Sequence, residues 1–357
     1  MLDWYDRHGR DLPWRRRRSL YGTWISEIML QQTTVAAVLP RWSAFLDRFP
    51  DVHALAAAPE ADVLAAWSHL GYYRRARLLH QAARRIVADG GRLPSDLAGW
   101  RSLPGVGDYA AGAIASIGLG DVAAAVDANV RRVLTRWWSD SPGAAAGLNA
   151  RRLQHLALQH LPPTRPGDWN EALMDLGATV CRTDQPRCGD CPVAAWCAAA
   201  QAGIVDQVPA PVKRVEPAAV CLGALVVRCG DRILVLPPEA AVVVRARGLG
   251  RPYREDLGGL LAGTLCVPLT PWYAGHLDDG QPFLAAWRAW FRSLGIDAGQ
   301  PTLAGVVRHV ITHHRLQVHV SAVTIDVRPP LGRWVEPTGD WPRSTLVARC
   351  LAKENMT

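Results

Sequence analysis

The sequence, 357 residues long, lacks any long apolar run. A helix that crosses a bilayer needs roughly 18 or more consecutive apolar residues, so we expect no membrane attachment. The first residues also lack the charged stretch and apolar run of a secretion signal, because residues 2–5 already begin an amphipathic helix. We therefore expect no targeting segment and a cytoplasmic location.

Acidic side chains are outnumbered by basic ones, 32 to 40, and the net charge at pH 7 is +8. The isoelectric point of about 9.3 favours a polyanionic partner such as nucleic acid. The 15 tryptophans are an unusual number; most should lie in cores, and some are available to stack on a nucleobase. The length suits about two or three domains.

Cysteine is sparse except in one segment, which holds Cys181, Cys188, Cys191 and Cys197. Without a secretion signal, such a group indicates metal ligands rather than disulfides. Four thiolates suit either tetrahedral zinc or a [4Fe-4S] cluster. Zinc sites usually show two short cysteine pairs, and the spacing C-x6-C-x2-C-x5-C contains only one.

The stretch 103–132 has the most distinctive local pattern. A tight turn at 103–107 places Gly105 and Gly107 on either side of one apolar residue, and a helix of small residues is predicted over 108–118. Such glycines let backbone N–H groups approach an anion. The alternative is a plain turn between two packed helices. Asp127 also has two interpretations, because an aspartate that caps a helix can be a catalytic carboxylate as well.

Two further segments place polar groups among apolar ones. Residues 21–49 are predicted as two helices broken at Pro40, and Glu27 has apolar neighbours in the first. If it is buried, its carboxyl can hold a proton near neutral pH; the alternative is an exposed helix edge. Tyr72 and Tyr73 stand beside arginines, which suits either base stacking with phosphate contacts or a core aromatic pair.

Beyond residue 200 the composition changes. Residues 201–218 contain several prolines and indicate a linker, and 219–350 mix strand patterns with a tryptophan-rich helix near 284–294. Gly230 marks a predicted hairpin turn, and further strands are expected near Val306 and Val318. The glutamate run of a metal-dependent pyrophosphatase is missing, so we expect an α/β domain without that activity.

Several of these motifs together resemble one family. The glycine turn and Asp127 are similar to the helix-hairpin-helix DNA glycosylases of the endonuclease III superfamily. SEIMLQQT at 26–33, LGYYRRA at 70–76 and the cysteine spacing are similar to its MutY branch, the adenine DNA glycosylases. The resemblance covers nearly the whole chain.

The resemblance implies a multidomain fold. An all-α helix-hairpin-helix glycosylase region occupies 1–200, with a six-helix part at about 22–127 and an iron-sulfur cluster subdomain made of 1–21 with 128–200. A linker follows at 201–218. A C-terminal α/β Nudix-like lesion-recognition domain then occupies 219–350.

The resemblance also implies roles for individual residues. Glu27 corresponds to the general acid and base, and Asp127 to the carboxylate that stabilises the sugar cation. Tyr109 and Asn129 would orient this pair. Cys181, Cys188, Cys191 and Cys197 would be the ligands of a structural [4Fe-4S] cluster. The residues implied to contact DNA or the flipped base are Trp14, Arg15, Leu30, Gln32, Tyr72, Tyr73, Gly105, Gly107, Glu171, Thr312 and His313.

Tyr109 distinguishes two chemistries within the superfamily. Members that also cleave the strand carry a lysine at this position, whose amine can form a Schiff base. The tyrosine therefore implies a monofunctional glycosylase that uses water. The implied reaction flips adenine, mispaired with 8-oxoguanine or guanine, out of double-stranded DNA and hydrolyses its N-glycosidic bond after protonation by Glu27. We expect a monomer acting in the bacterial cytoplasm, at the nucleoid.

Residues 311–313 depart from the family pattern. The loop that detects 8-oxoguanine is Phe-Ser-His in the family and Ile311-Thr312-His313 here, so an aliphatic side chain replaces the ring. Isoleucine has no ring face for stacking, which weakens the expected preference for the oxidised base. Two alternatives stay open: a thymine glycosylase of the same fold for T:G mismatches, which lacks the C-terminal domain, and a non-catalytic lesion-binding protein.

Overall fold

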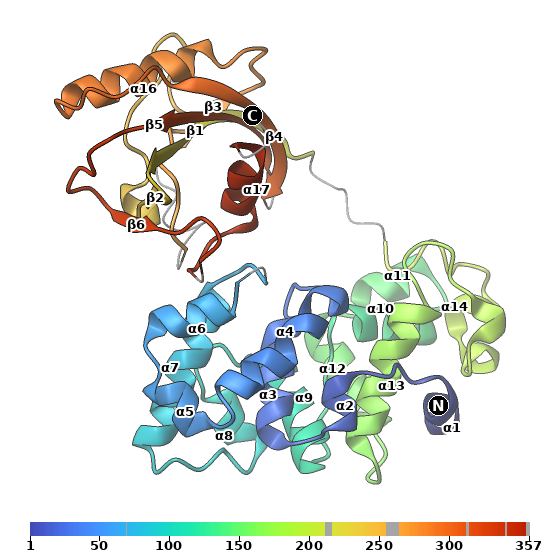
Figure 1. Ribbon diagram of the computed structural model, residues 1–357. Helices are drawn as coiled ribbons and strands as arrows, with labels where there is room; N and C mark the ends of the chain where they lie inside the picture. Colours follow the sequence, from blue (N-terminus) through green and yellow to red (C-terminus); the bar gives the residue numbers. More distant parts are fainter. Residues whose placement is uncertain (69, 211–215, 255–263, 312–313, 340, 355–357) are drawn as a thin grey trace. The chain divides into compact units, whose positions relative to one another are not determined.

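The structure, a computed structural model, describes residues 1–68, 70–210, 216–254, 264–311, 314–339 and 341–354. The chain forms two compact units, Met1–Ala58 with Leu78–Lys213 and Pro59–Arg77 with Arg214–Thr357 (Figure 1). Within the described ranges, no helix is long and apolar enough to cross a membrane.

The first unit is helical, as the sequence predicted. Polar residues start several of its helices; Ser19, Asp51 and Asp96 each accept a hydrogen bond from a backbone N–H of the first turn. Its helices are α1 (Leu2–His8), α2 (Pro13–Arg16), α3 (Leu20–Leu30), α4 (Val35–Arg48), α5 (Val52–Ala57), α7 (Arg74–Ala88, which begins in the second unit), α8 (Leu97–Arg101), α9 (Asp108–Ile114), α10 (Ala128–Trp138), α11 (Pro142–Gly147), α12 (Ala150–Gln159), α13 (Pro166–Thr179) and α14 (Ala198–Gln201). A π-helical turn, Ala115–Leu119, extends α9.

The break between α3 and α4 differs from the prediction. It lies after Leu30, where Gln32 has a left-handed backbone with φ of 56°, and Pro40 lies inside α4. The predicted break at Pro40 was therefore wrong. A proline inside a helix forgoes one backbone hydrogen bond, and here the buried face with Trp42 and Phe45 holds the helix together.

Tryptophans form much of the core beneath α3. Trp24 is fully buried and its ring lies 5.5 Å from that of Trp100, centroid to centroid. The Trp42 indole N–H donates a 3.1 Å hydrogen bond to the carbonyl of Gly22. Large, well-packed rings restrict the motion of the helix that carries Glu27.

The second unit contains α6 (Glu60–Ala66) and, in its C-terminal part, a mixed β-sheet with helices. The sheet and its helices confirm the expected α/β character of the C-terminal part. The described strands have the order β4-β5-β1-β2-β6, with β3 beside β1, and β1 runs parallel to β5. The strands are β1 (Ala218–Cys229), β2 (Arg232–Val235), β3 (Tyr273–Ala274), β4 (Thr302–Ile311), β5 (His314–Thr324) and β6 (Arg333–Val335). The helices α16 (Gln281–Ser293) and α17 (Thr345–Glu354) pack against the sheet (Figure 1).

The predicted hairpin between the first two strands is confirmed. Cys229 pairs with Arg232 across an antiparallel register, and Gly230 has a φ of 60°. Only glycine adopts that backbone angle without strain. The hairpin turns β1 back into β2 and so starts the sheet.

Candidate active site

A cavity of about 600 Å3 in the helical unit is lined by α2, α3, α9, α10 and α13. The predicted site residues that line it are Trp14, Arg15, Glu27, Leu30, Gln32, Gly107, Tyr109, Asp127, Asn129 and Glu171. Arg10 and Met174, which sequence reasoning missed, line it as well. Residues far apart in the sequence thus meet at one place.

Glu27 is 5% exposed, so the alternative of an exposed helix edge is wrong. Its Oε2 accepts a 2.8 Å hydrogen bond from the Tyr109 hydroxyl. The pKa of the Glu27 carboxyl is raised to about 7, chiefly by burial and further by the nearby carboxyls of Glu171 and Asp127, and the bond from Tyr109 limits the rise. A carboxyl with that pKa is partly protonated at neutral pH and can donate its proton.

Tyr109 lies on the first turn of α9 and contacts Glu27 on one side and Met174 Sδ, at 3.8 Å, on another. Burial and the Glu27 carboxyl raise the pKa of the Tyr109 hydroxyl well above its usual value. The hydroxyl therefore remains a hydrogen-bond donor at neutral pH. It supplies no amine nucleophile to the cavity.

Asp127 both caps a helix and lines the cavity, so its two interpretations hold together. Its Oδ1 accepts a 2.7 Å bond from the backbone N–H of Val130 at the start of α10, and its Oδ2 accepts a 3.0 Å bond from Asn129 Nδ2. Asn129 Oδ1 in turn accepts a 3.1 Å bond from Arg132, which also donates to the Gly177 carbonyl. The Asp127 carboxylate is fixed at the positive end of the helix dipole.

Glu171, on α13, is only 4% exposed and does not belong to the helix surface. Its Oε1 accepts a 3.0 Å bond from Arg15 Nε. Its Oε2 accepts bonds of 2.7 Å from the Tyr5 hydroxyl and 2.6 Å from Arg18 Nη2. Two guanidinium groups thus compensate this buried carboxylate.

Asp175, one helical turn after Glu171, completes an ionic group that the sequence analysis missed. It is fully buried and accepts bonds of 2.7 and 3.0 Å from the two terminal nitrogens of Arg15, and a 2.6 Å bond from Arg10 Nε. Burial alone would raise the pKa of Asp175, but Arg15 and Arg10 hold it below its usual range. The available signal was the pair of acidic residues at i and i+4, Glu171 and Asp175, in the mainly apolar second half of the helix.

The glycine hairpin between α8 and α9 lies beside the turn that follows α3. Gly105 has a φ of 79°, and an added Cβ would lie 2.8 Å from Leu78 Cβ, so this position requires glycine. Gly107 has an extended backbone and open space around it. Gln31 Nε2 donates a 3.5 Å bond to the Gly105 carbonyl, which ties the turn with Gln32 to the hairpin.

Tyr72 and Tyr73 lie in the second unit and differ in exposure. Tyr72 is 51% exposed and has a left-handed backbone with φ of 46°, whereas Tyr73 is buried. The interpretation as a core aromatic fits Tyr73. The ring of Tyr72 remains available for stacking.

The four clustered cysteines line one small cavity, which also contains apolar side chains such as Val180. The Arg136 guanidinium donates a 3.4 Å bond to Cys181 Sγ, and Cys197 Sγ donates to the Arg136 carbonyl at 3.3 Å. Among the described residues, no three cysteine, histidine or acidic side chains converge closely enough to hold a single metal ion. The four thiols thus share the lining of one cavity.

Thr312 and His313, the predicted lesion-sensing residues, lie outside the described residues. The flanking Ile311 and His314 form the last antiparallel pair of β4 and β5. The His314 Nε2 lies 3.1 Å from the Tyr253 hydroxyl.

Residues 25–157 match the HhH-GPD superfamily of base excision DNA repair proteins, the class that the hairpin and the buried carboxyl already indicate. Human adenine DNA glycosylase is 33% identical, over 94% of this chain and 69% of the human protein. The adenine DNA glycosylase of Mycolicibacterium smegmatis is 45% identical, over 54% of this chain and 66% of that protein. The chain belongs to the adenine DNA glycosylase family.

The solved structure of a thermostable thymine-DNA glycosylase is also similar, with a TM-score of 0.53 at 31% identity. That alignment uses 93% of the thymine glycosylase chain but only 56% of this one. The thymine glycosylase therefore has almost no residues left that could match the rest of this chain. The human and mouse adenine DNA glycosylases, by contrast, each align over 94% of this chain.

Proposed function

We propose that this protein is a monofunctional adenine DNA glycosylase of base excision repair, which removes adenine mispaired with 8-oxoguanine or guanine. One observation carries the proposal: Glu27 is buried, has a pKa of about 7 and faces the same cavity as the carboxylate of Asp127. A protonated carboxyl that can act as the acid, with a second carboxyl beside the sugar, is what acid-assisted cleavage of a glycosidic bond requires.

Base flipping is the first step. The hairpin at Gly105 and Gly107 grips the DNA backbone through its N–H groups, and Gln32 enters the base stack from the adjacent turn. A second side chain enters the base stack beside Gln32. Tyr72 is a better candidate for it than Tyr73, because the ring of Tyr72 is exposed whereas that of Tyr73 is buried. An exposed ring can stack on a base without rearrangement of a core.

The flipped adenine enters the cavity among Trp14, Leu30, Arg15 and Glu171. Glu171 Oε2 already accepts two hydrogen bonds, whereas Oε1 accepts one, from Arg15. A carboxylate oxygen can accept two bonds, so Oε1 retains an acceptor site for the exocyclic amine of adenine. The ionic group with Asp175 holds that acceptor in place.

The chemistry needs a proton and a stabilised cation. Glu27 donates its proton to N7 of adenine, and the bond between the base nitrogen and C1′ breaks with its electron pair leaving on the base. The Asp127 carboxylate, oriented by Asn129, stabilises the oxocarbenium ion that forms at the sugar. Water then adds to C1′ and gives its proton to Glu27, which leaves free adenine and an abasic site. Tyr109 keeps Glu27 oriented throughout.

The cysteine cavity fits a [4Fe-4S] cluster better than zinc. Cys181, Cys188, Cys191 and Cys197 line one cavity, and their spacing contains one short cysteine pair where a zinc site usually has two. Bound there, the cluster supplies a rigid cross-link of residues 181–197. These residues would hold a loop for DNA phosphates, and no step of base release passes through them.

The C-terminal part, 219–350, completes the proposed enzyme as a Nudix-like lesion-recognition domain after the linker at 201–218. The helical region then comprises a six-helix part at about 22–127 and a cluster part made of 1–21 with 128–200. Thr312 and His313 would detect the oxidised base. Support comes from the mixed sheet and from relatives that align along nearly the whole chain.

Single-turnover release of base from duplexes with A:8-oxoguanine, A:G or T:G pairs tests the proposal. We expect adenine release from the first two, fastest opposite 8-oxoguanine, and loss of that preference in His313→Ala. Equal rates on A:8-oxoguanine and A:G would remove the lesion-sensing role. Thymine release from T:G alone would favour the thymine glycosylase, and no release from any duplex would favour a non-catalytic binding protein.

A further inference from the structure

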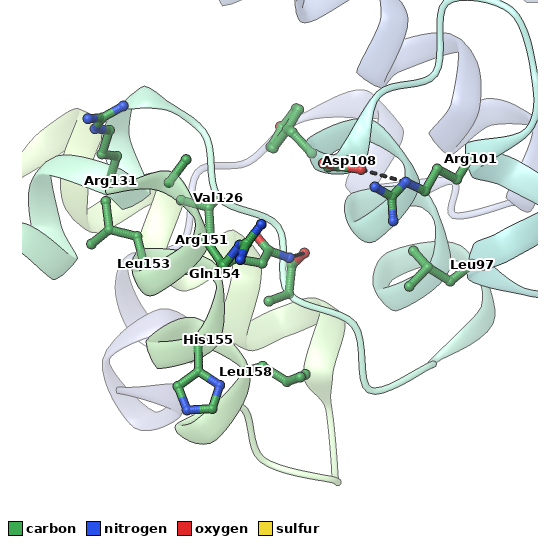
Figure 2. A pocket seen from close by; sticks show the side chains of 13 residues that line it. Leu97, Arg101, Asp108, Val126, Arg131, Arg151, Leu153, Gln154, His155 and Leu158 are labelled. Atoms are coloured by element: carbon green, nitrogen blue, oxygen red, sulfur yellow. Dashed lines mark hydrogen bonds and ion pairs between the residues drawn. The ribbon is translucent and has the colours of Figure 1, made fainter. Parts of the chain in front are cut away.

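A second cavity in the helical unit, of about 660 Å3, is not used by the proposed mechanism (Figure 2). It is lined by both ends of α8, by the first turn of α9 and by residues of α10 and α12, and its cationic side chains are Arg101, Arg131 and Arg151. In Figure 2, Arg131 and Arg101 lie at opposite edges of the view and Arg151 lies between them. We call this cavity the basic groove.

The charges of the basic groove are only partly compensated. Arg101 forms a 2.6 Å ion pair with Asp108, and both side chains are largely exposed (Figure 2). In the described part of the chain, no ion pair involves Arg131 or Arg151, although both line the groove. Like charges around a concave surface repel one another and favour an anionic occupant.

The basic groove adjoins the active-site cavity. Tyr109 lines both of them, and so do neighbours in sequence: Asp108 lines the groove and Gly107 the active site. The hairpin at Gly105 connects α8 to α9, and both helices contribute to the groove. A DNA strand held by the hairpin therefore has the groove directly beside it.

The lining of the basic groove suits a sugar–phosphate chain. Leu97, Val126 and Leu158 add apolar surface to the lining that the arginines share. Deoxyribose has apolar carbon–hydrogen faces between its charged phosphates, so a single backbone presents both kinds of surface. A helical peptide would instead need acidic residues on an apolar face, and it would gain nothing from proximity to the hairpin.

We infer that the basic groove binds the sugar–phosphate backbone of the DNA strand next to the flipped nucleotide, with Arg131 and Arg151 each contacting a phosphate. The inference rests on the proposed function, since it requires that the hairpin grip DNA. It assigns the groove a positioning role. Contacts there hold the strand in register while the adenine occupies the neighbouring cavity.

The test compares two adjacent arginines of α12. Both side chains are exposed, but only Arg151 lines the groove. The probe is a duplex with an A:8-oxoguanine pair whose adenosine carries a 2′-fluorine, which blocks excision. Because each phosphate contact contributes about 0.9 to the slope of log K against log salt, Arg151→Ala should lower that slope by about 0.9. Arg152→Ala should leave it unchanged.

A neutral backbone linkage locates the contact. Methylphosphonates placed one at a time beside the adenosine should weaken binding of the unaltered protein at one position, and Arg151→Ala should be insensitive to that same position. Equal salt slopes for Arg151→Ala and the unaltered protein, or equal loss at every linkage in both, would overturn the inference. These binding measurements do not depend on base release. If the proposed activity fails, the protein will bind the probe but release no adenine from the unmodified duplex.

Discussion

Glu27 and Asp175 are both buried carboxyl groups of the same helical unit, and their surroundings differ. Glu27 accepts one hydrogen bond from a neutral hydroxyl, and burial raises its pKa to about 7. Asp175 accepts bonds from Arg15 and Arg10, which hold its pKa below the usual range in spite of burial. Burial alone therefore does not decide the protonation state; the charge of the partner does.

The contrast separates a chemical role from a structural one. A carboxyl without a cationic partner keeps a proton that it can give away, at a cost in stability. A carboxylate surrounded by guanidinium groups remains charged and orders them. Glu27 and Glu171 both line the cavity, and Arg15 connects Glu171 to the buried Asp175 behind it.

The largest expected effect is that of Glu27→Gln. Glutamine can still accept the Tyr109 hydrogen bond but has no proton to donate, so we expect the single-turnover rate to fall by about 10²–10⁴-fold. The affinity for an A:8-oxoguanine duplex should be retained. Glu60→Gln, at an exposed site, is the control. A rate within tenfold of the unaltered protein would show that Glu27 is not the acid.

Asp127→Asn should come next, with a loss of about 10²–10³-fold in the same assay. Asparagine caps helices as well as aspartate does, so α10 and its contact with Val130 should persist. The negative charge opposite the developing cation is what disappears. Loss of DNA binding with a normal rate for the bound fraction would contradict the assignment.

Asp175→Asn should act on stability rather than on proton donation. Removal of the Asp175 charge takes away the ion pair of Arg10 and leaves Arg15 with Glu171 alone, and the free energy of unfolding should drop by about 3–5 kcal/mol, measured in urea at neutral pH. Asp168→Asn, whose partners are more exposed, should cost under about 1 kcal/mol. A smaller loss of unfolding free energy in Asp175→Asn than in Asp168→Asn would contradict the structural role of Asp175.

A smaller effect concerns the stability of Glu27→Gln. The folded pKa of Glu27 lies near 7, above the usual 4.5, so its contribution to stability is complete below pH 4.5 and is lost as the pH rises through 7. The difference in the free energy of unfolding between Glu27→Gln and the unaltered protein should therefore shift in favour of the variant by up to about 3 kcal/mol from pH 4.5 to pH 8. Urea unfolding at both pH values measures the gain, and parallel pH dependence of the two proteins would contradict it.

The sequence predicted most helices and the C-terminal strands, because apolar periodicity and cap residues are local signals. It failed at Pro40, since the break between α3 and α4 depends on the left-handed turn at Gln32 rather than on the proline. It left Glu27 undecided between core and surface. Only packing against Trp24 and its neighbours determines which side of α3 is buried.

The site was predicted in part for the same reason. Glu27, Tyr109 and Asp127 stand in recognisable motifs, and the structure brings them to one cavity. Asp175 belongs to no motif, and its importance depends on contacts with Arg15 and Arg10 more than 150 residues away. Pairings over that distance follow from the tertiary fold, which local sequence patterns do not contain.

The pH dependence of single-turnover adenine release tests the central claim most directly. If Glu27 is the proton donor with a pKa of about 7, the rate on an A:8-oxoguanine duplex should fall about tenfold for each pH unit above pH 7. The residual rate of Glu27→Gln should not show that decline. A rate that stays constant or rises from pH 7 to pH 9 would contradict a protonated Glu27 and with it the proposed mechanism.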